Sequence, residues 1–250
     1  MDILELMVRI LFCFGAASVC YLIGNINFAI IISKLKKRDV RKEDSGNPGA
    51  MNMLRNFGTL YGGLTLLLDA LKGAFAAVLG WFVLGGFSFT EATRGIQPAL
   101  GQLGMYVGGA AVIIGHVFPV FFKFKGGKGI ASSIGVCFVL NPWVMLITLG
   151  VGVIFILLTK MGSVTSFIII GFPLAFKCLD VAKGMAFVPP HMLDIAWASI
   201  GLMILIFLLT LWAHRKNLKK LFLGVERKTS IFSRYKSVEG AKKKGAAKER

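Results

Sequence analysis

Long apolar stretches alternate with short polar ones along most of the chain, and this pattern predicts membrane-spanning helices. Several apolar windows approach or exceed the ~20 residues that an α-helix needs to cross a bilayer core. The fold class is therefore an all-α polytopic membrane protein. We expect a single integral-membrane domain over residues 1–226 and a basic, disordered tail over residues 227–250. The seven expected transmembrane segments are residues 4–32, 60–86, 99–122, 130–140, 142–158, 164–179 and 191–213.

The stretch 130–158 is open to two interpretations, because Asn141-Pro142 interrupts it. A proline in a helix interior removes a hydrogen bond and clashes with the preceding turn. The stretch is either one kinked helix or two segments that meet at a turn. In the second case the short first segment has to tilt, or to stop part-way where protein covers it. The charge pattern favours two segments.

Composition supports a membrane protein, and charge orients it. Apolar residues make up 56% of the chain and charged residues 16%, against roughly half and a quarter in soluble domains. The net charge of +17 is concentrated in residues 34–55, residues 123–128, Lys160 and the stretch after residue 214. Seven segments with the N-terminus outside place all four regions and the C-terminus in the cytoplasm, as the positive-inside rule requires. Aromatic residues do not interleave with these clusters, so we expect no nucleic-acid partner.

The polar loop between the first two segments is more elaborate than a simple connection. In Ser45-Gly-Asn-Pro-Gly49, the glycines allow backbone N–H groups to converge on a ligand, and such concave nests bind anions. Arg55 adds a planar guanidinium that suits phosphate. Taken alone, the loop fits an ordinary interfacial turn equally well.

A second glycine-rich loop, Lys125-Gly-Gly-Lys-Gly129, leads into a predicted helix. Unpaired N–H groups and the positive end of the helix dipole favour phosphate at such a position. The G-x-x-x-x-G-K-[ST] pattern is not matched, so this is not a Walker A loop. Lysines that snorkel from an interfacial loop are the alternative.

Further polar residues lie near the same predicted side. The hydroxyl-rich run Ser163–Ser166 opens a span, where a helix cap is the alternative role, and residues 214–217 (His-Arg-Lys-Asn) follow the last span. Asp69 and Lys72 share one face of the second span and form either a structural pair or a substrate contact. His116 is either a hydrogen-bonded core residue or a site residue. Because the loops and both polar runs converge on one face, the sequence predicts a phosphate-binding site there.

Together these motifs resemble those of the bacterial acyl-phosphate:glycerol-3-phosphate acyltransferases, the PlsY family. The resemblance rests on residues 45–55, 115–129 and 214–217, and it covers about residues 18–226. It implies an integral inner-membrane enzyme with its active site on the cytoplasmic side. Such an enzyme transfers an acyl chain from acyl phosphate to the 1-hydroxyl of sn-glycerol 3-phosphate. The products are 1-acyl-glycerol 3-phosphate and inorganic phosphate, in the first acylation of phospholipid synthesis.

The resemblance also implies which residues act. The expected catalytic residues are Ser45, Arg55, Lys128, His214 and Asn217. The expected substrate-binding residues are Gly46, Asn47, Gly49, Asn52, Gly126, Gly127, Gly129, Ser163, Ser166, Arg215 and Glu226. One departure concerns the end of the first span, where the family's usual Gly-Ser-Ile-Pro reads Gly24-Asn-Ile-Asn27.

A phosphate oxygen of the substrate is the expected acceptor of the hydroxyl proton, with His214 as the alternative base. The chain has no H-x-x-x-x-D pattern, which argues against the acyltransferases that pair His with Asp as a general base. Acyl phosphate is already activated, so this reading requires no cofactor and no metal.

The expected partners are the two substrates and membrane lipids, and we expect a monomer. Two other classes use the same basic loops. A membrane transporter of a phosphorylated or anionic solute would need polar residues that reach the outer side, and the later spans almost lack them. A lipid-binding scaffold would give the glycine loops a structural role only.

Overall fold

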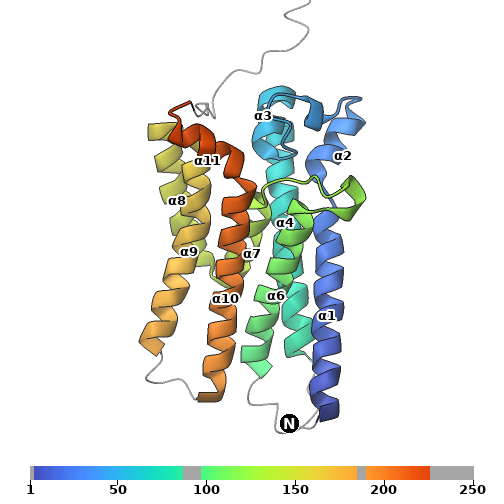
Figure 1. The fold of residues 1–250 in the computed structure, drawn as a ribbon, viewed down its shortest axis with the longest axis vertical. Coiled ribbons are helices and arrows are strands. Elements are labelled where there is room, and N and C mark those ends of the chain that lie inside the picture. Colours follow the sequence, from blue (N-terminus) through green and yellow to red (C-terminus); the bar gives the residue numbers. More distant parts are fainter. Residues whose placement is uncertain (1–2, 87–96, 185–189, 226–250) are drawn as a thin grey trace, which may run out of the picture.

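The computed structural model describes residues 3–86, 97–184 and 190–225, which form an upright bundle of helices (Figure 1). The all-α class is confirmed for these residues. The long helices are α1 (Ile3–Asn25), α4 (Thr59–Gly85), α6 (Gln97–Val117), α8 (Pro142–Thr159), α9 (Gly162–Gly184) and α10 (Pro190–Ala213). The shorter ones are α2 (Phe28–Leu35), α3 (Ala50–Phe57), α7 (Ile130–Leu140) and α11 (Arg215–Phe222), with 3-10 turns η1 (Val40–Lys42) and η2 (Val120–Phe122).

Six of the described helical stretches are long and apolar enough to cross a membrane, and each overlaps a predicted span. The remaining predicted span corresponds to α7, which has only 11 residues. At a rise of 1.5 Å per residue, α7 is about 16 Å long, roughly half of the ~30 Å hydrocarbon core. Six of the seven predicted spans are therefore supported by length, and α7 alone is too short to cross a bilayer.

The turn at Asn141 separates α7 from α8, so the interpretation of 130–158 as two segments is confirmed. Asn141 Oδ1 accepts a hydrogen bond from the Val144 N–H at 3.0 Å, which caps α8, and Pro142 is the first residue of that helix. Proline fits this position because a first-turn N–H has no intrahelical partner. A proline that would break one helix thus begins another.

The first predicted span, residues 4–32, is not a continuous helix. α1 ends at Asn25, and α2 begins at Phe28. Asn27 caps α2, because its Oδ1 accepts a hydrogen bond from the Ile30 N–H at 3.0 Å. Both asparagines are fully buried. The side-chain amides of Asn25 and Asn27 were the only sequence signal for this break, and the apolar residues on both sides made the run look like one span.

Helix α4 packs directly against α6 and α7, and small residues make this contact possible. A Cβ placed on Gly80 of α4 would overlap the carbonyl of Gly104 on α6, and one on Gly135 of α7 would overlap the carbonyl of Ala70. Small residues at such crossings let membrane helices approach closely. The backbones of α4, α6 and α7 therefore touch, and they form a closely packed support.

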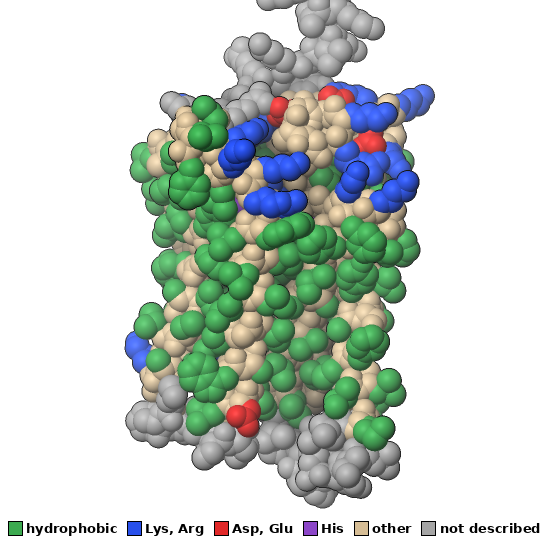
Figure 2. Space-filling view, viewed as in Figure 1, with side chains coloured by type: hydrophobic (Ala, Val, Ile, Leu, Met, Phe, Trp, Pro, Cys, Tyr) green, Lys and Arg blue, Asp and Glu red, His purple; other side chains and the backbone are tan. Residues whose placement is uncertain are grey.

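One end of the bundle carries most of the described charge. The α2–α3, η2–α7 and α8–α9 connections lie there together with α11 (Figure 1), and lysine and arginine side chains gather there in Figure 2. We call this the basic end. The four predicted basic regions, as far as they are described, thus share one end of the molecule. Residues 227–250, the predicted tail, lie outside the described residues.

Candidate active site

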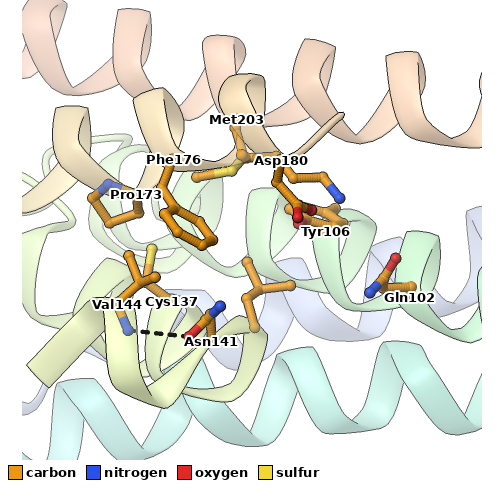
Figure 3. Close-up of a pocket in the computed structure, with 11 residues that line it drawn as sticks. Gln102, Tyr106, Cys137, Asn141, Val144, Pro173, Phe176, Asp180 and Met203 are labelled. Carbon is orange, nitrogen blue, oxygen red and sulfur yellow. Dashed lines mark hydrogen bonds between the residues drawn. The ribbon is translucent and has the colours of Figure 1, made fainter. Parts of the chain in front are cut away.

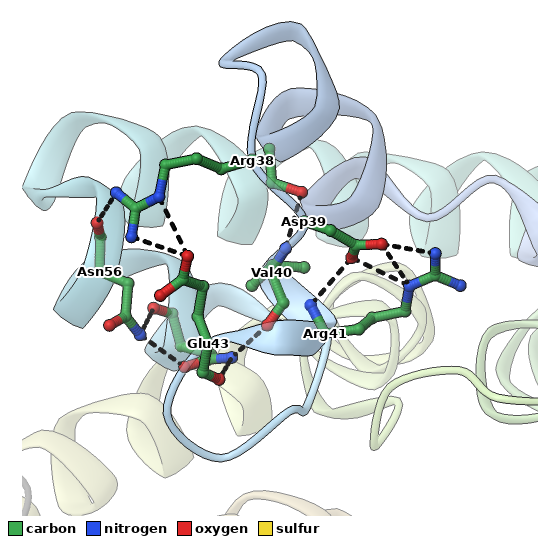
Figure 4. Close-up of polar contacts among 8 residues, drawn as sticks. Arg38, Asp39, Val40, Arg41, Glu43 and Asn56 are labelled. Atoms are coloured by element: carbon green, nitrogen blue, oxygen red, sulfur yellow. Dashed lines mark hydrogen bonds and ion pairs between the residues drawn. The ribbon is translucent and has the colours of Figure 1, made fainter.

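A polar network fixes the start of the first loop (Figure 4). Arg38 pairs with Glu43 at 2.9 Å and donates a hydrogen bond to the Asn56 carbonyl at 3.1 Å. Arg41 pairs with Asp39 at 2.7 Å, and its hydrogen bonds lower the pKa of Asp39 to about 2. These contacts tie η1 to the end of α3, so the loop between them is held at both ends.

Asn52 shapes the first loop from inside. Its side chain is only 2% exposed, and its amide donates hydrogen bonds to the carbonyls of Val40 (3.0 Å) and Glu43 (3.1 Å). Its Oδ1 accepts a hydrogen bond from Asn56 at 2.8 Å. The resemblance implied a substrate contact, but the structure turns this amide away from the surface. Asn52 therefore supports the loop instead of presenting a group to a ligand.

The exposed part of the first loop is a tight turn. Gly46 has φ +69°, a backbone conformation that favours glycine, and the Asn47 N–H approaches Ser45 Oγ at 3.4 Å. Gly49 then caps α3. Arg55, in the last turn of that helix, pairs with Asp44 at 3.3 Å. The Gly46 and Gly49 N–H groups donate within the loop, to the carbonyls of Glu43 (2.8 Å) and Asn47 (3.0 Å). The polar side chains of the loop are therefore its candidate ligand groups, and not a nest of backbone amides.

The second loop packs its glycines onto the end of α6. The Gly127 N–H donates a hydrogen bond to the His116 carbonyl at 3.1 Å. A Cβ on Gly126 would overlap that same carbonyl, and a Cβ on Gly127 would overlap His116 Nε2. Gly129, with φ +80°, is the N-cap residue of α7, whose first N–H groups lack intrahelical acceptors. Lys128, between Gly127 and Gly129, is half-buried.

The two loops touch each other, as the sequence predicted. A Cβ on Gly127 would lie 3.0 Å from the carbonyl oxygen of Pro48. The same carbonyl accepts a hydrogen bond from Asn27 Nδ2 at 3.3 Å. Asn27 was noted only as a departure from the family pattern, and the structure shows that it links the α1–α2 break to the first loop. The sequence signal for this role of Asn27 was a polar residue inside a predicted span.

The last two predicted segments meet on the other side of the glycine loop. Asn217 of α11 donates a hydrogen bond from Nδ2 to Ser163 Oγ of α9 at 2.9 Å. His214, at the α10–α11 junction, is 2% exposed and lies edge-on to the ring of Phe167, with centroids 5.3 Å apart. Lys128 is close enough to His214 to act on it electrostatically. All four predicted regions therefore converge at the basic end.

The protonation of His214 follows from its surroundings. Burial, and after it the charge of Lys128, lowers the pKa of His214 to about 4, although the Thr210 carbonyl opposes this shift. The ring is therefore neutral at pH 7. Nδ1 lies 2.9 Å from the Thr210 carbonyl, which can only accept, so Nδ1 carries the proton. Nε2 is left as a hydrogen-bond acceptor.

Because His214 is buried and neutral, we expect the folded protein to lose stability at low pH. The unfolded chain protonates His214 near pH 6.5 and the folded chain near pH 4, so the stability present above pH 6.5 is lost as the pH falls through that window. The expected loss from this residue is about 3 kcal/mol. Thermal unfolding of the wild type and His214→Gln in detergent, measured from pH 7 to pH 4, gives the residue's share as the difference between the two curves. Parallel curves would contradict the prediction.

Besides Asn52, three further predicted site residues are placed differently or lie outside the described residues. Ser166 Oγ donates to the Gly162 carbonyl of its own helix at 3.0 Å. Arg215 is exposed and stacks on Trp212, with its guanidinium carbon 3.8 Å from the ring centroid, so the structure does not bring it to the loops. Glu226 lies outside the described residues.

A separate cavity of about 100 Å³ lies among α6, α7, α8, α9 and α10 (Figure 3). The turn residue Asn141, Tyr106 of α6 and Lys177 in the last turns of α9 line it. None of the predicted site residues lines it. The candidate site lies instead at the basic end, where loops and helix ends meet and where Ser163 and His214 are buried.

Comparisons with known proteins agree with this site. The family model described as glycerol-3-phosphate acyltransferase matches residues 14–224. The glycerol-3-phosphate acyltransferase of Mycoplasmopsis pulmonis is 33% identical over 230 residues, which cover 90% of this chain and 95% of that protein. That of Finegoldia magna is 38% identical over 213 residues, covering 84% and 92%.

Solved structures show the same fold. A crystal structure of PlsY, an integral membrane glycerol 3-phosphate acyltransferase, in its glycerol 3-phosphate form is 31% identical. It aligns with 87% of this chain and 96% of its own, at a TM-score of 0.67. Its lysophosphatidic acid form gives 30% identity and a TM-score of 0.66. With a family match over most of its length, close-to-complete coverage of its relatives and two phosphate-suited loops in contact, this chain belongs to the glycerol-3-phosphate acyltransferase family.

Proposed function

We propose that this acyltransferase uses acyl phosphate as its donor and the 1-hydroxyl of sn-glycerol 3-phosphate as its acceptor. The hydroxyl oxygen attacks the carbonyl carbon and forms the new ester bond. The bond between that carbon and the phosphate oxygen breaks, and inorganic phosphate leaves with the electron pair. The product is 1-acyl-glycerol 3-phosphate. The contact between the two phosphate-suited loops at Pro48 and Gly127 is the observation that carries this proposal.

Each loop has a proposed substrate. Lys128 and the glycine turn at 126–129 bind the acyl phosphate, since an ammonium and first-turn N–H groups stabilise the charge that develops on departing phosphate. Ser45 and Arg55, with Asn217 and Ser163, hold the glycerol phosphate. The two groups of residues are neighbours, because Lys128 lies close enough to His214 to act on it electrostatically. Holding the hydroxyl against the carbonyl carbon lowers the barrier by several kcal/mol.

The hydroxyl proton goes to a phosphate oxygen of the substrate in this proposal. His214 has an acceptor nitrogen available, but a pKa of about 4 makes it a weak base at pH 7, and efficient general bases have pKa values near the working pH. Its proposed role is to accept the hydroxyl hydrogen bond and orient the oxygen. Near-normal turnover by His214→Gln would exclude the histidine as the base.

We further propose that the basic end faces the cytoplasm of a bacterial inner membrane and that the N-terminus lies outside. The clustering of lysine and arginine at one end of the bundle supports this orientation (Figure 2), because cytoplasmic loops are enriched in these residues. Labelling of single cysteines introduced at Lys37 and Lys160 tests it: both should react only from the cytoplasmic side.

The activity has a direct chemical test. Purified protein is mixed with acyl phosphate and glycerol 3-phosphate, and released phosphate is measured together with lysolipid. Phosphate and lysolipid should form in equal amounts. Lysolipid without matching phosphate would indicate another donor, and background levels of both would contradict the proposed reaction.

A further inference from the structure

A buried charged cluster lies under the two loops, inside the membrane-spanning part of the bundle. Lys72 of α4 is 6% exposed and Asp69, one turn before it, is 1% exposed. Lys72 Nζ lies 2.8 Å from Asp69 Oδ1 and 2.9 Å from Nδ1 of His116 on α6. The sequence left open whether this pair contacts substrate, and its burial excludes direct contact in this conformation.

The ammonium of Lys72 is fully used within the protein. It donates to His116 Nδ1 and to the carbonyls of Ile26 (2.5 Å) and Gly24 (3.3 Å) in the α1–α2 break, and its charge pairs with Asp69. A lysine ammonium has three donors and no acceptor. His116 Nδ1 must therefore accept, which places the imidazole proton on Nε2, the atom that faces Gly127.

Through the α1–α2 break, Lys72 reaches the first loop. Its two carbonyl partners, Gly24 and Ile26, lie on either side of Asn25, and Ile26 directly precedes Asn27. Asn27 in turn donates to the Pro48 carbonyl at 3.3 Å. Pro48 lies next to the turn at Ser45–Asn47. Its position thus depends on the α1–α2 break, where the carbonyls of Gly24 and Ile26 accept hydrogen bonds from Lys72.

Through His116, the same ammonium reaches the second loop. The imidazole lies against Gly127, and the His116 carbonyl accepts the Gly127 N–H at 3.1 Å. Lys72 holds the imidazole by its other edge. The Lys72 side chain therefore contacts both the α1–α2 break, which supports the first loop, and His116, which supports the second.

Stability alone does not account for such a cluster. Burying an ion pair has a desolvation penalty that often exceeds the Coulombic gain, so apolar residues of similar shape are frequently neutral or stabilising replacements. Removing only one partner is strongly destabilising, because it leaves an unpaired buried charge. The effect of removing both charges separates a structural role from a functional one.

We propose that Lys72 is a positioning residue of the acyl transfer, which sets the two substrate loops at the spacing that brings hydroxyl and carbonyl together. The inference rests on the proposed function, since it assigns one reactant to each loop. It predicts a loss in kcat that exceeds the change in either KM, because each loop still binds its phosphate while their relative placement is wrong.

The test compares Lys72→Met, Asp69→Asn and the double variant D69N/K72M with the wild type, in the phosphate-release assay and by thermal unfolding in detergent. The single variants should unfold at lower temperature, and the double variant should regain much of the wild-type midpoint. Its kcat should stay at least about tenfold low, with each KM within about threefold of wild type, because misplacement of about 1 Å can lower rates by 10²-fold. Lys177→Met is the matched control, since this lysine is half-buried and lines the separate cavity at Asn141, and it should keep wild-type kcat.

Each result bears on the inference. A folded double variant with kcat within about twofold of wild type would overturn it, and so would a defect confined to one KM, which would assign Lys72 to a single loop. If the double variant does not fold, His116→Asn and His116→Ala replace it. Asn keeps an acceptor near the Nδ1 position and should retain more kcat than Ala, whereas equal kcat values would overturn the inference. An inactive wild type would instead contradict the proposed reaction.

Discussion

Gly127→Ala lowers kcat/KM by about 10²-fold while the helical bundle stays folded, because displacing reacting groups by about 1 Å has effects of that size. The new methyl group would overlap Nε2 of His116 and lie 3.0 Å from the Pro48 carbonyl. His116 is fixed by Lys72 and Pro48 by Asn27. Neither neighbour has freedom to move aside, so the glycine loop itself must shift.

The measurement is kcat/KM for both substrates, with thermal unfolding to establish that the variant is folded. Gly150→Ala is the control, since a Cβ at Gly150 meets nothing within 4 Å. That control should keep wild-type activity and gain up to about 1 kcal/mol of stability, as Ala does relative to Gly in a helix. Activity of Gly127→Ala within about threefold of wild type would contradict the prediction, because it would show that the loop accommodates the methyl group without displacing the reacting groups.

Lys128→Met lowers kcat by about 10²- to 10³-fold, the range found when a group that stabilises developing charge is removed. The ammonium is the half-buried cation of the glycine loop, and methionine keeps most of the chain length without the charge. The measurement is kcat with acyl phosphate at saturation. Lys125→Met, an exposed neighbour in the same loop, serves as the control and should change kcat little.

The same variant has an effect independent of activity. Lys128 is one of the causes that lower the pKa of His214 to about 4, so removing it raises the folded-state pKa toward the ordinary value. The gap between folded and unfolded pKa values then narrows, and less stability is lost between pH 6.5 and pH 4 than in the wild type. An unchanged acid limb of the unfolding curve would show that Lys128 does not lie near His214.

The sequence predicted the helical class and the convergence of the two loops with the polar runs 163–166 and 214–217 at one end, because each depends on strong local signals. Long apolar runs mark spans, glycine with lysine marks the loops, and basic residues mark the shared end. The break at Asn25–Asn27 was missed, since two amides change the mean hydropathy of a 29-residue segment little. The role of Asn52 was missed for another reason: only the fold shows that its amide faces the carbonyls of Val40 and Glu43.

Long-range side-chain geometry was the other part that sequence could not provide. Asp69 and Lys72 share a helix face by spacing alone, but their third partner, His116, is 44 residues further along the chain. Similarly, Arg215 follows His214 directly, yet it stacks on Trp212 instead of joining the site. Neighbours in sequence diverge at the α10–α11 junction, because the chain changes direction there.

The glycine crossings of α4 with α6 and α7 limit what the site can accept. The carbonyls of Gly80, Gly104 and Ala70 already occupy the space that any added Cβ would need, so these three helices have no smaller separation available. A binding site supported by these three tightly packed helices is preorganised, which reduces the conformational entropy that binding would otherwise cost. If each loop binds one phosphate as proposed, selectivity for a small polyol phosphate depends on the fixed distance between the two loops, and a bulkier acceptor has to displace the loops themselves.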